Sequence, residues 1–357
     1  MKLLLTGAST DRVCGTRDYA TTLAEPLRRI GADVRFLWWD RATRTLDSWT
    51  ADLRDAVADA DVTLWQYSCF TYTKRGLPTL VPRVLRALTQ DGVPLVTVLH
   101  ELVFPWGVNG VRGAVHAATH RFALHPIVRA SAGLVVTTEE RREWVESRRW
   151  LPHRPTTFLP VVSNIAGTTP AERNDDELRV GVFGFRRLQL PVQLIVDSVA
   201  RVPRAHLVLV GAPGPNTPEA ETWRKAAAAA GAPELVSFTG VLDPEPLASE
   251  LAAVDLVLFP DPIGPTTRRG TLAAALAHGK PVVALDGPQT WDRFLREHAL
   301  TVVPPEIDAL AEAMRRLAAD PRARAEQGRR ARAFHDRYAA PDVVADGLLS
   351  FASRAAR

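Results

Sequence analysis

The sequence predicts an α/β protein with two doubly wound, Rossmann-like parallel-sheet domains that face a cleft, and a C-terminal helix that crosses back to the first domain. Its 357 residues exceed what one hydrophobic core usually serves. Short apolar runs without polar alternation indicate parallel strands covered on both faces. Helical segments separate these runs, and the alternation stops at a polar stretch near residue 170 and then restarts.

The first half begins with the short apolar strand 2–7, which ends in a glycine. In the helix expected next, over 17–32, Tyr19, Leu23, Leu27 and Ile30 recur at helical spacing before Gly31. A second helix, over 80–92, is closed by a glycine in the same way. The remaining apolar runs are the expected strands 33–39, 61–67, 94–100, 132–138 and 156–162.

The polar segment "GTTPAERNDDE" lacks periodicity and is typical of an interdomain linker. We therefore expect an N-terminal domain over 1–168, a second domain over 169–335 and a returning helix over 336–357. In the second domain the expected strands are 178–184, 205–211, 235–240, 255–260 and 281–286. The expected helices are 189–202, 218–231, 243–254 and 271–279, and the chain from 308 onward is expected to be helical.

Composition narrows the class of protein. The net charge of +4 is too small for the length to imply a nucleic-acid partner, but it favours anionic ligands. The two cysteines, Cys14 and Cys69, are far apart in the sequence and do not have the spacing of metal ligands. So few cysteines indicate a reducing compartment and no disulfide framework. The start is too quickly polar for a signal peptide, and there is no apolar run of about 20 residues. We expect a cytoplasmic protein without a membrane span.

The stretch "PTTRRGT" places two arginines at the start of a helix, where the helix dipole disfavours cations. Thr266 and Thr267 are natural N-caps, whereas Arg268 and Arg269 cost a few tenths of a kcal/mol each there. A bound anion such as pyrophosphate would make the two positive charges favourable at the helix start. The alternative is two solvated arginines; we favour the anion site.

Other candidates follow strand ends. Gly15 precedes the first helix, where it lets a ligand approach backbone N–H groups. A G-x-G-x-x-G fingerprint is missing there, so a nicotinamide cofactor is not expected. His100 ends its strand beside Glu101 and an aromatic loop; the alternative is a satisfied interior histidine. Arg186 and Arg187 follow the first strand of the second domain, where arginine is suited to bind a phosphate. The alternative is a solvated basic turn.

Three further features have plainer interpretations. His116 and His120 share a helix face, but no third zinc ligand is evident, so no metal is expected. The basic segment around Trp144 and Trp150 allows peripheral contact with an anionic membrane, although a solvated helix is the simpler interpretation. The arginines between 322 and 337 are interpreted as a solvated helix face.

In order and spacing, these motifs resemble the retaining GT-B glycosyltransferases of family 4, from about residue 3 to 340. "PLVTVLHE" resembles the strand that ends in their active-site histidine, and "RVGVFGF" the first strand of their nucleotide-binding domain. "VSFTGVLDPEPLASELAAVDLVLFP" and "TLAAALAHGKPVVA" are similar to their next conserved blocks. "GPTTRRGT" resembles a subgroup with a G-x-S/T-x-R-R-G-S/T loop.

The resemblance implies roles for individual residues. His100, Arg186 and Arg269 would be catalytic, with His100 near the donor sugar and the arginines at the pyrophosphate. Donor contacts would come from Gly15, Arg187, Val241, Leu242, Gly264, Thr266, Thr267, Arg268, Gly270 and Thr271. Acceptor contacts would come from the strand-end loops of the first domain, which vary in such folds, at Gln66, Tyr67, Glu101, Trp106 and Asn109.

The sequence also departs from that family. Two glutamates that typical members carry are replaced by Thr266 and Ala274, and a lysine after the phosphate-binding arginine is missing. We hypothesise that Arg269 replaces this lysine, with a contribution from Arg268. The implied chemistry is retaining transfer without a metal or other cofactor, in which the enzyme positions the substrates and stabilises the departing pyrophosphate.

The expected partners are a nucleotide-diphosphate sugar and a small natural-product or sugar-like acceptor, and the expected state is a monomer or homodimer. A lipid carrier or a growing polysaccharide remains an alternative acceptor. Two other functions stay open: a non-hydrolysing nucleotide-sugar 2-epimerase, which needs acid and base carboxylates, and a non-catalytic nucleotide-sugar binding protein, suggested by the missing glutamates.

Overall fold

The computed structural model describes residues 1–10, 14–74, 76–168, 177–184 and 190–357. The chain folds into two compact units, one of residues 1–162 with 341–357 and the other of residues 163–340. The second unit begins at Ser163 and ends at Ala340, where the sequence placed these limits at 169 and 335.

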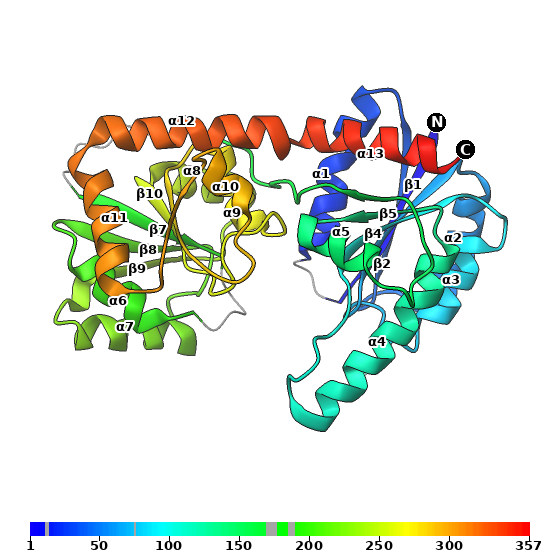
Figure 1. Cartoon of the computed structure of the whole chain (residues 1–357), viewed down its shortest axis with the longest axis horizontal. Coiled ribbons are helices and arrows are strands. Elements are labelled where there is room, and N and C mark those ends of the chain that lie inside the picture. The colour runs from blue at the N-terminus through cyan, green and yellow to red at the C-terminus, as the bar shows by residue number, and fades with distance from the viewer. Residues whose placement is uncertain (11–13, 75, 169–176, 185–189) are drawn as a thin grey trace. The chain divides into compact units, whose positions relative to one another are not determined.

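The first unit is built on a six-stranded sheet in which every neighbouring pair is parallel. Its strand order is β2-β1-β3-β4-β5-β6, and because every pair is parallel the carboxyl ends of the six strands lie at one edge. This unit holds both chain termini (Figure 1). The strands are β1 (Lys2–Ser9), β2 (Asp33–Asp40), β3 (Val62–Ser68), β4 (Leu95–Glu101), β5 (Gly133–Val136) and β6 (Thr156–Phe158).

Helices cover both faces of this sheet and create two apolar cores. The helices are α1 (Gly15–Arg29), α2 (Leu46–Ala58), α3 (Val81–Thr89), α4 (Gly110–Ala130), α5 (Glu139–Glu146) and α13 (Pro341–Ala355). The last of these, α13, packs beside α1, and the Phe351 ring lies so close to Gly133 that a Cβ there would approach it to 2.8 Å. The expected return of the C-terminal helix to the first domain is confirmed.

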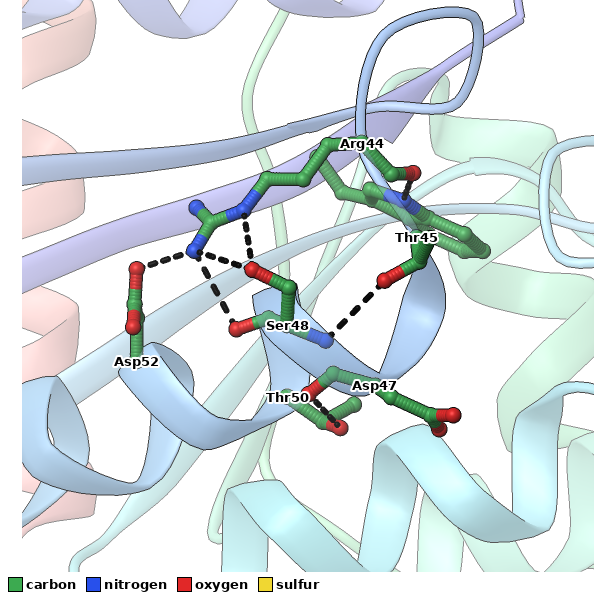
Figure 2. A network of polar contacts seen from close by, with 7 residues as sticks. Arg44, Thr45, Asp47, Ser48, Thr50 and Asp52 are labelled. Carbon is green, nitrogen blue, oxygen red and sulfur yellow. Dashed lines mark hydrogen bonds and ion pairs between the residues drawn. The ribbon is translucent and has the colours of Figure 1, made fainter.

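Helix α2 was not foreseen in the sequence, and its start is fixed by local polar contacts (Figure 2). Thr45 caps it by accepting from the Ser48 N–H at 3.2 Å. Arg44 donates to the Ser48 carbonyl and pairs with Asp52, while its own carbonyl accepts from the Trp39 indole at 2.8 Å. Trp49, Leu53, Ala56 and Val57 are buried at helical spacing, so apolar periodicity in the sequence does predict a helix here.

The second unit repeats the plan with another six-stranded sheet whose pairs are all parallel. Its order is β12-β11-β10-β7-β8-β9, so β10, β7, β8 and β9 lie side by side. The strands are β7 (Leu178–Phe183), β8 (Ala205–Val210), β9 (Val236–Gly240), β10 (Leu256–Phe259), β11 (Val282–Leu285) and β12 (Thr301–Val303). Only the short β12 was not expected.

Helices again cover both faces. They are α6 (Val192–Ala200), α7 (Pro218–Ala229), the short 3₁₀ helix η1 (Pro233–Leu235), α8 (Pro244–Ala253), α9 (Gly270–Ala277), α10 (Asp292–Arg296), α11 (Ile307–Ala319) and α12 (Pro321–Tyr338). Prolines open α12 and α13, where a missing N–H costs nothing, and divide the helical tail. None of the described helices combines the length and the apolarity needed to cross a membrane.

Candidate functional site

The first unit brings several candidates to the carboxyl edge of its sheet. Gly15 opens α1 behind Cys14, whose side chain makes no capping hydrogen bond. A Cβ built on Gly15 would meet no atom within 4 Å, and its φ is not positive. Neither packing nor backbone conformation therefore requires glycine here, and the contact of Gly15 with a ligand stays a prediction.

His100 lies at the end of β4, next to β3 in the sheet. Its Nε2 is 2.7 Å from Oε1 of the buried Gln66, and the edge of its ring meets Tyr19 in a T-shaped contact at 5.0 Å. Because a carbonyl oxygen only accepts, Nε2 carries the proton and Nδ1 keeps its lone pair. The Gln66 Nε2 and the Tyr19 hydroxyl are buried without a hydrogen-bond partner among the described residues.

Burial, and secondarily the nearby Arg141 charge, lowers the pKa of His100 to about 3. An unfolded histidine titrates near pH 6.5, so between those values the unfolded chain binds a proton that the folded chain does not. We predict that the free energy of unfolding falls by up to a few kcal/mol as the pH drops from about 6.5 to 3. Urea unfolding measured across this range tests it. In His100→Asn the slope should be shallower; an unchanged slope would contradict the assignment.

Arg141 was not identified from the sequence, although it organises this edge. It comes from α5 and donates to the His100 carbonyl, to the Thr137 hydroxyl at 2.9 Å and to Glu101 at 2.6 Å. Its side chain is only 12% exposed. The hydrogen bond to the carbonyl holds the backbone of His100, and the ion pair engages Glu101, which is one of the predicted acceptor residues.

The predicted acceptor residues do not share one surface. Tyr67 is fully buried and stacks on Tyr72 at 6.0 Å, so it belongs to the aromatic core of this unit and not to a strand-end loop. The error arose because β3 alternates large aromatic residues that face inward on a sheet covered on both sides. Trp106 and Asn109 lie in the exposed segment before α4, and Asn109 adopts a left-handed φ of 59°.

The His116–His120 pair serves packing. The rings stack at 6.1 Å, and His120 is buried with both nitrogens engaged. Its Nδ1 accepts from the Phe104 N–H at 3.2 Å, and its Nε2 donates to the Gly76 carbonyl at 2.9 Å. Within the described ranges, no three His, Cys, Asp or Glu side chains gather to hold a metal ion.

In the second unit, three glycines with positive φ follow neighbouring strands at the carboxyl edge. They are Gly184 after β7, Gly211 after β8 and Gly240 at the end of β9, with φ of 72°, 81° and 71°. A side chain on Gly184 would approach the Thr271 methyl to 2.8 Å. Glycine at these positions keeps side chains off the edge beside the start of α9.

The loop between β10 and α9 contains an ion pair that the sequence did not reveal. Asp261 is only 1% exposed, and its Oδ2 accepts from Nε and Nη2 of Arg269 at 2.8 and 2.7 Å. Its Oδ1 accepts from the Ile263 N–H at 3.2 Å. Arg269 is the N-cap of α9, and a buried carboxylate next to the helix start offsets the unfavourable position of its charge.

Thr266 is the other notable residue of this loop. It is 2% exposed, and its hydroxyl has no hydrogen-bond partner among the described residues. Gly264, with φ of 89°, is required because a Cβ there would come within 2.2 Å of the Thr290 hydroxyl. The loop therefore places a buried, unsatisfied hydroxyl four residues before Gly270, whose backbone N–H is the first of those that open α9.

The remaining predicted donor residues are distributed along the same edge. Thr267, Arg268, Gly270 and Thr271 are partly exposed around the start of α9, and Val241 is exposed after β9 with Leu242 beside it. Arg186 and Arg187 lie outside the described residues. Ala274, at one position of the missing glutamates, is fully buried in α9.

Comparison with known proteins identifies a domain in the second unit and the fold of the chain. Residues 179–320 match the family model described as "Glycosyl transferases group 1". No curated protein sequence matches the chain. Among solved structures, sucrose-phosphate synthase from Thermosynechococcus elongatus is similar over 99% of this chain and 98% of its own, with 18% identity and a TM-score of 0.71.

Two other solved structures are informative. HepE from Anabaena, in complex with UDP and glucose, covers 99% of this chain and all of its own, at 16% identity and a TM-score of 0.69. A protein from Listeria monocytogenes described as a putative UDP-N-acetylglucosamine 2-epimerase is similar over 98% of this chain and 95% of its own, at 14% identity and a TM-score of 0.60. The chain therefore has the GT-B fold, and its second unit carries a glycosyl transferases group 1 domain.

Proposed function

We propose that the chain is a retaining glycosyltransferase of family 4 that needs no metal and moves a sugar from a nucleotide-diphosphate sugar to a small natural-product or sugar-like acceptor. The group 1 domain over 179–320 and the GT-B fold support the reaction class. The observation that carries the donor proposal is the buried, unpartnered Thr266 hydroxyl at the start of α9. The oxygens of a bound phosphate would accept hydrogen bonds from this hydroxyl and from the N–H groups of Gly270 and Thr271.

In this proposal the second unit binds the donor. Arg269 is held in one orientation by Asp261, and Gly264 shapes the loop that contacts the sugar and phosphates. Fixed donors of this kind stabilise the charge that develops on the departing diphosphate, which is the task a divalent cation performs elsewhere. The departing phosphate takes the acceptor proton on the face where the acceptor attacks.

The first unit is proposed to bind the acceptor and to supply His100 to the reacting sugar. Neutral His100, with its proton on Nε2 and a lone pair on Nδ1, is suited to accept a hydrogen bond from a sugar hydroxyl. The N–H groups around Gly15 are proposed to contact the donor phosphate or sugar. Trp106 and Asn109 are the accessible acceptor candidates.

Thr266→Val separates ligand binding from stability. Valine keeps the shape of threonine but removes a buried hydroxyl that has no partner in the protein, so we predict unfolding stability equal to wild type or higher by about 1 kcal/mol. Nucleoside-diphosphate affinity should fall about tenfold, because a hydrogen bond to a charged oxygen is lost. Urea unfolding and calorimetric titration with the diphosphate give the two values. Unchanged affinity would remove Thr266 from the donor site. Thr63→Val, which removes another buried hydroxyl without a partner among the described residues, is the matched control.

The class of donor is tested by thermal shift with UDP, GDP, TDP and ADP, since a diphosphate that binds the folded chain raises its unfolding temperature. The nucleotide that binds then selects the nucleotide sugars for turnover with candidate acceptors. The anomeric configuration of the product, read by NMR, decides between retention and inversion. If none of the four diphosphates shifts the transition, the proposed donor site is wrong.

A 2-epimerase is the second candidate, because the Listeria structure with that description shares the fold. Incubation with a UDP-sugar and no acceptor discriminates, since an epimerase converts the sugar and a transferase does not. The group 1 domain favours the transferase. At the carboxyl edges Asp261 and Glu101 are each paired with an arginine, whereas Asp40 and Asp286 accept hydrogen bonds from their own turns.

A further inference from the structure

Exposed apolar side chains are concentrated on and just before α4. Among the described residues twelve large apolar side chains are exposed, and five of them lie within residues 106–122. Val111 and Phe122 are 84% and 83% exposed, the two highest values of the twelve. We call these five residues the α4 patch; they are Trp106, Val108, Val111, Val115 and Phe122.

The helical part of the patch forms one stripe. Val111, Val115 and Phe122 are spaced four and seven residues apart, which places them on the same side of the helix. The opposite side is buried and carries Gly113, Ala117, His120, Ala123, Leu124, Ile127 and Val128. In Figure 1, α4 extends away from the sheet of its own unit. The outer side of α4 is thus apolar where a surface helix is normally polar.

The patch is held in place by hydrogen bonds. His120 ties the helix to Phe104 and Gly76, and Arg121 donates to the carbonyls of Phe104 and Ala117 at 2.9 and 2.8 Å. The Arg121 guanidinium lies over the ring of Trp106, 4.7 Å from its centroid. Trp106 is therefore kept at the surface beside the stripe, although more than half of its side chain is exposed.

The charge around the patch is positive. Helix α4 contains three arginines and no acidic residue. Arg148, which follows α5, lies close enough to Arg121 for the two positive charges to interact. Burial lowers the pKa of Arg121, and the nearby Arg148 charge lowers it further. An anionic partner would neutralise this local excess of positive charge.

We propose that the α4 patch binds an anionic lipid surface, with its valines and aromatic rings at the boundary of headgroups and acyl chains and the arginines at the lipid phosphates. Apolar residues flanked by arginines on one surface helix suit this position. A second copy of the chain fits less well, because a two-fold interface would bring the same arginines together without acids between them. The inference does not depend on the transferase proposal, since binding is measured without turnover.

Cosedimentation of the full chain with phosphatidylcholine vesicles, with and without about 25% phosphatidylglycerol, tests the proposal. We expect binding to the anionic vesicles only, weakened in about 0.5 M NaCl. Phe122→Ser should weaken it about tenfold, because the exposed ring changes no packing inside the protein. Val343→Ser on α13, whose side chain is 43% exposed, is the matched control and should bind like wild type.

Equal sedimentation with both kinds of vesicle, none with either, or full binding by Phe122→Ser would overturn the proposal. Sedimentation velocity of the protein alone tests whether the patch binds a second copy of the chain. A dimer that forms with rising concentration and is lost in Phe122→Ser would assign the patch to a second copy of the chain instead. Circular dichroism of each variant establishes that any loss of binding occurs in the folded chain.

Discussion

Arg269→Ala should unfold at markedly lower urea concentration than wild type, with a loss of about 2 to 4 kcal/mol. The substitution leaves the Asp261 carboxylate, which is 1% exposed, without the two hydrogen bonds from Nε and Nη2. Such a loss far exceeds that for an exposed pair, which contributes at most about 1 kcal/mol. Arg329→Ala, which breaks a solvent-exposed pair with Glu326, is the matched control.

A double variant separates the structural role of Arg269 from contact with the donor. Asp261→Leu combined with Arg269→Met replaces the buried pair by apolar side chains of similar volume, which is often neutral for stability. We expect the unfolding midpoint to recover toward wild type while affinity for the nucleoside diphosphate stays low. If affinity recovers together with stability, Arg269 acts only on the fold of the loop and does not contact the phosphates.

The ion pair between Asp261 and Arg269 also shows how much of the proposed donor site could be predicted from the sequence. The strand, the loop and the start of α9 follow from an apolar run, a Pro/Gly turn and an alanine-rich segment, and they lie where expected. The two arginines at the start of α9 indicated a nearby anion, and the structure supplies one from the protein itself, the carboxylate of Asp261. Asp261 lies eight residues before Arg269, and no periodicity or motif relates two residues across an irregular loop.

The first unit shows a second limit. Parallel strands buried on both faces are recognisable from composition, but such a strand does not reveal which of its residues reach the carboxyl edge with an exposed side chain. His100 and Tyr67 both lie near strand ends, yet only His100 is partly exposed. The contacts of Arg141 join β4 to α5 across 40 residues of chain, and the sequence alone carries no signal for them.

Replacing the partner of His100 should change the dependence of catalysis on pH. In the wild type the pKa of His100 is about 3, so the ring stays neutral from pH 5 to 8 and this group should add no step to the rate profile. In Gln66→Glu a carboxylate lies against Nε2 and favours the protonated ring. The pKa of His100 should then rise toward the neutral range.

If Nδ1 must accept a hydrogen bond from the sugar, Gln66→Glu should lose kcat as the pH falls below that raised pKa, because a protonated ring only donates. His100→Ala should lower kcat about 10²-fold at every pH, since the group is then missing altogether. Tyr19→Phe is the matched control, because it keeps the ring contact with His100 and removes only a hydroxyl without a partner among the described residues. A Gln66→Glu profile that matches wild type from pH 5 to 8 would show that the protonation state of His100 does not matter for transfer.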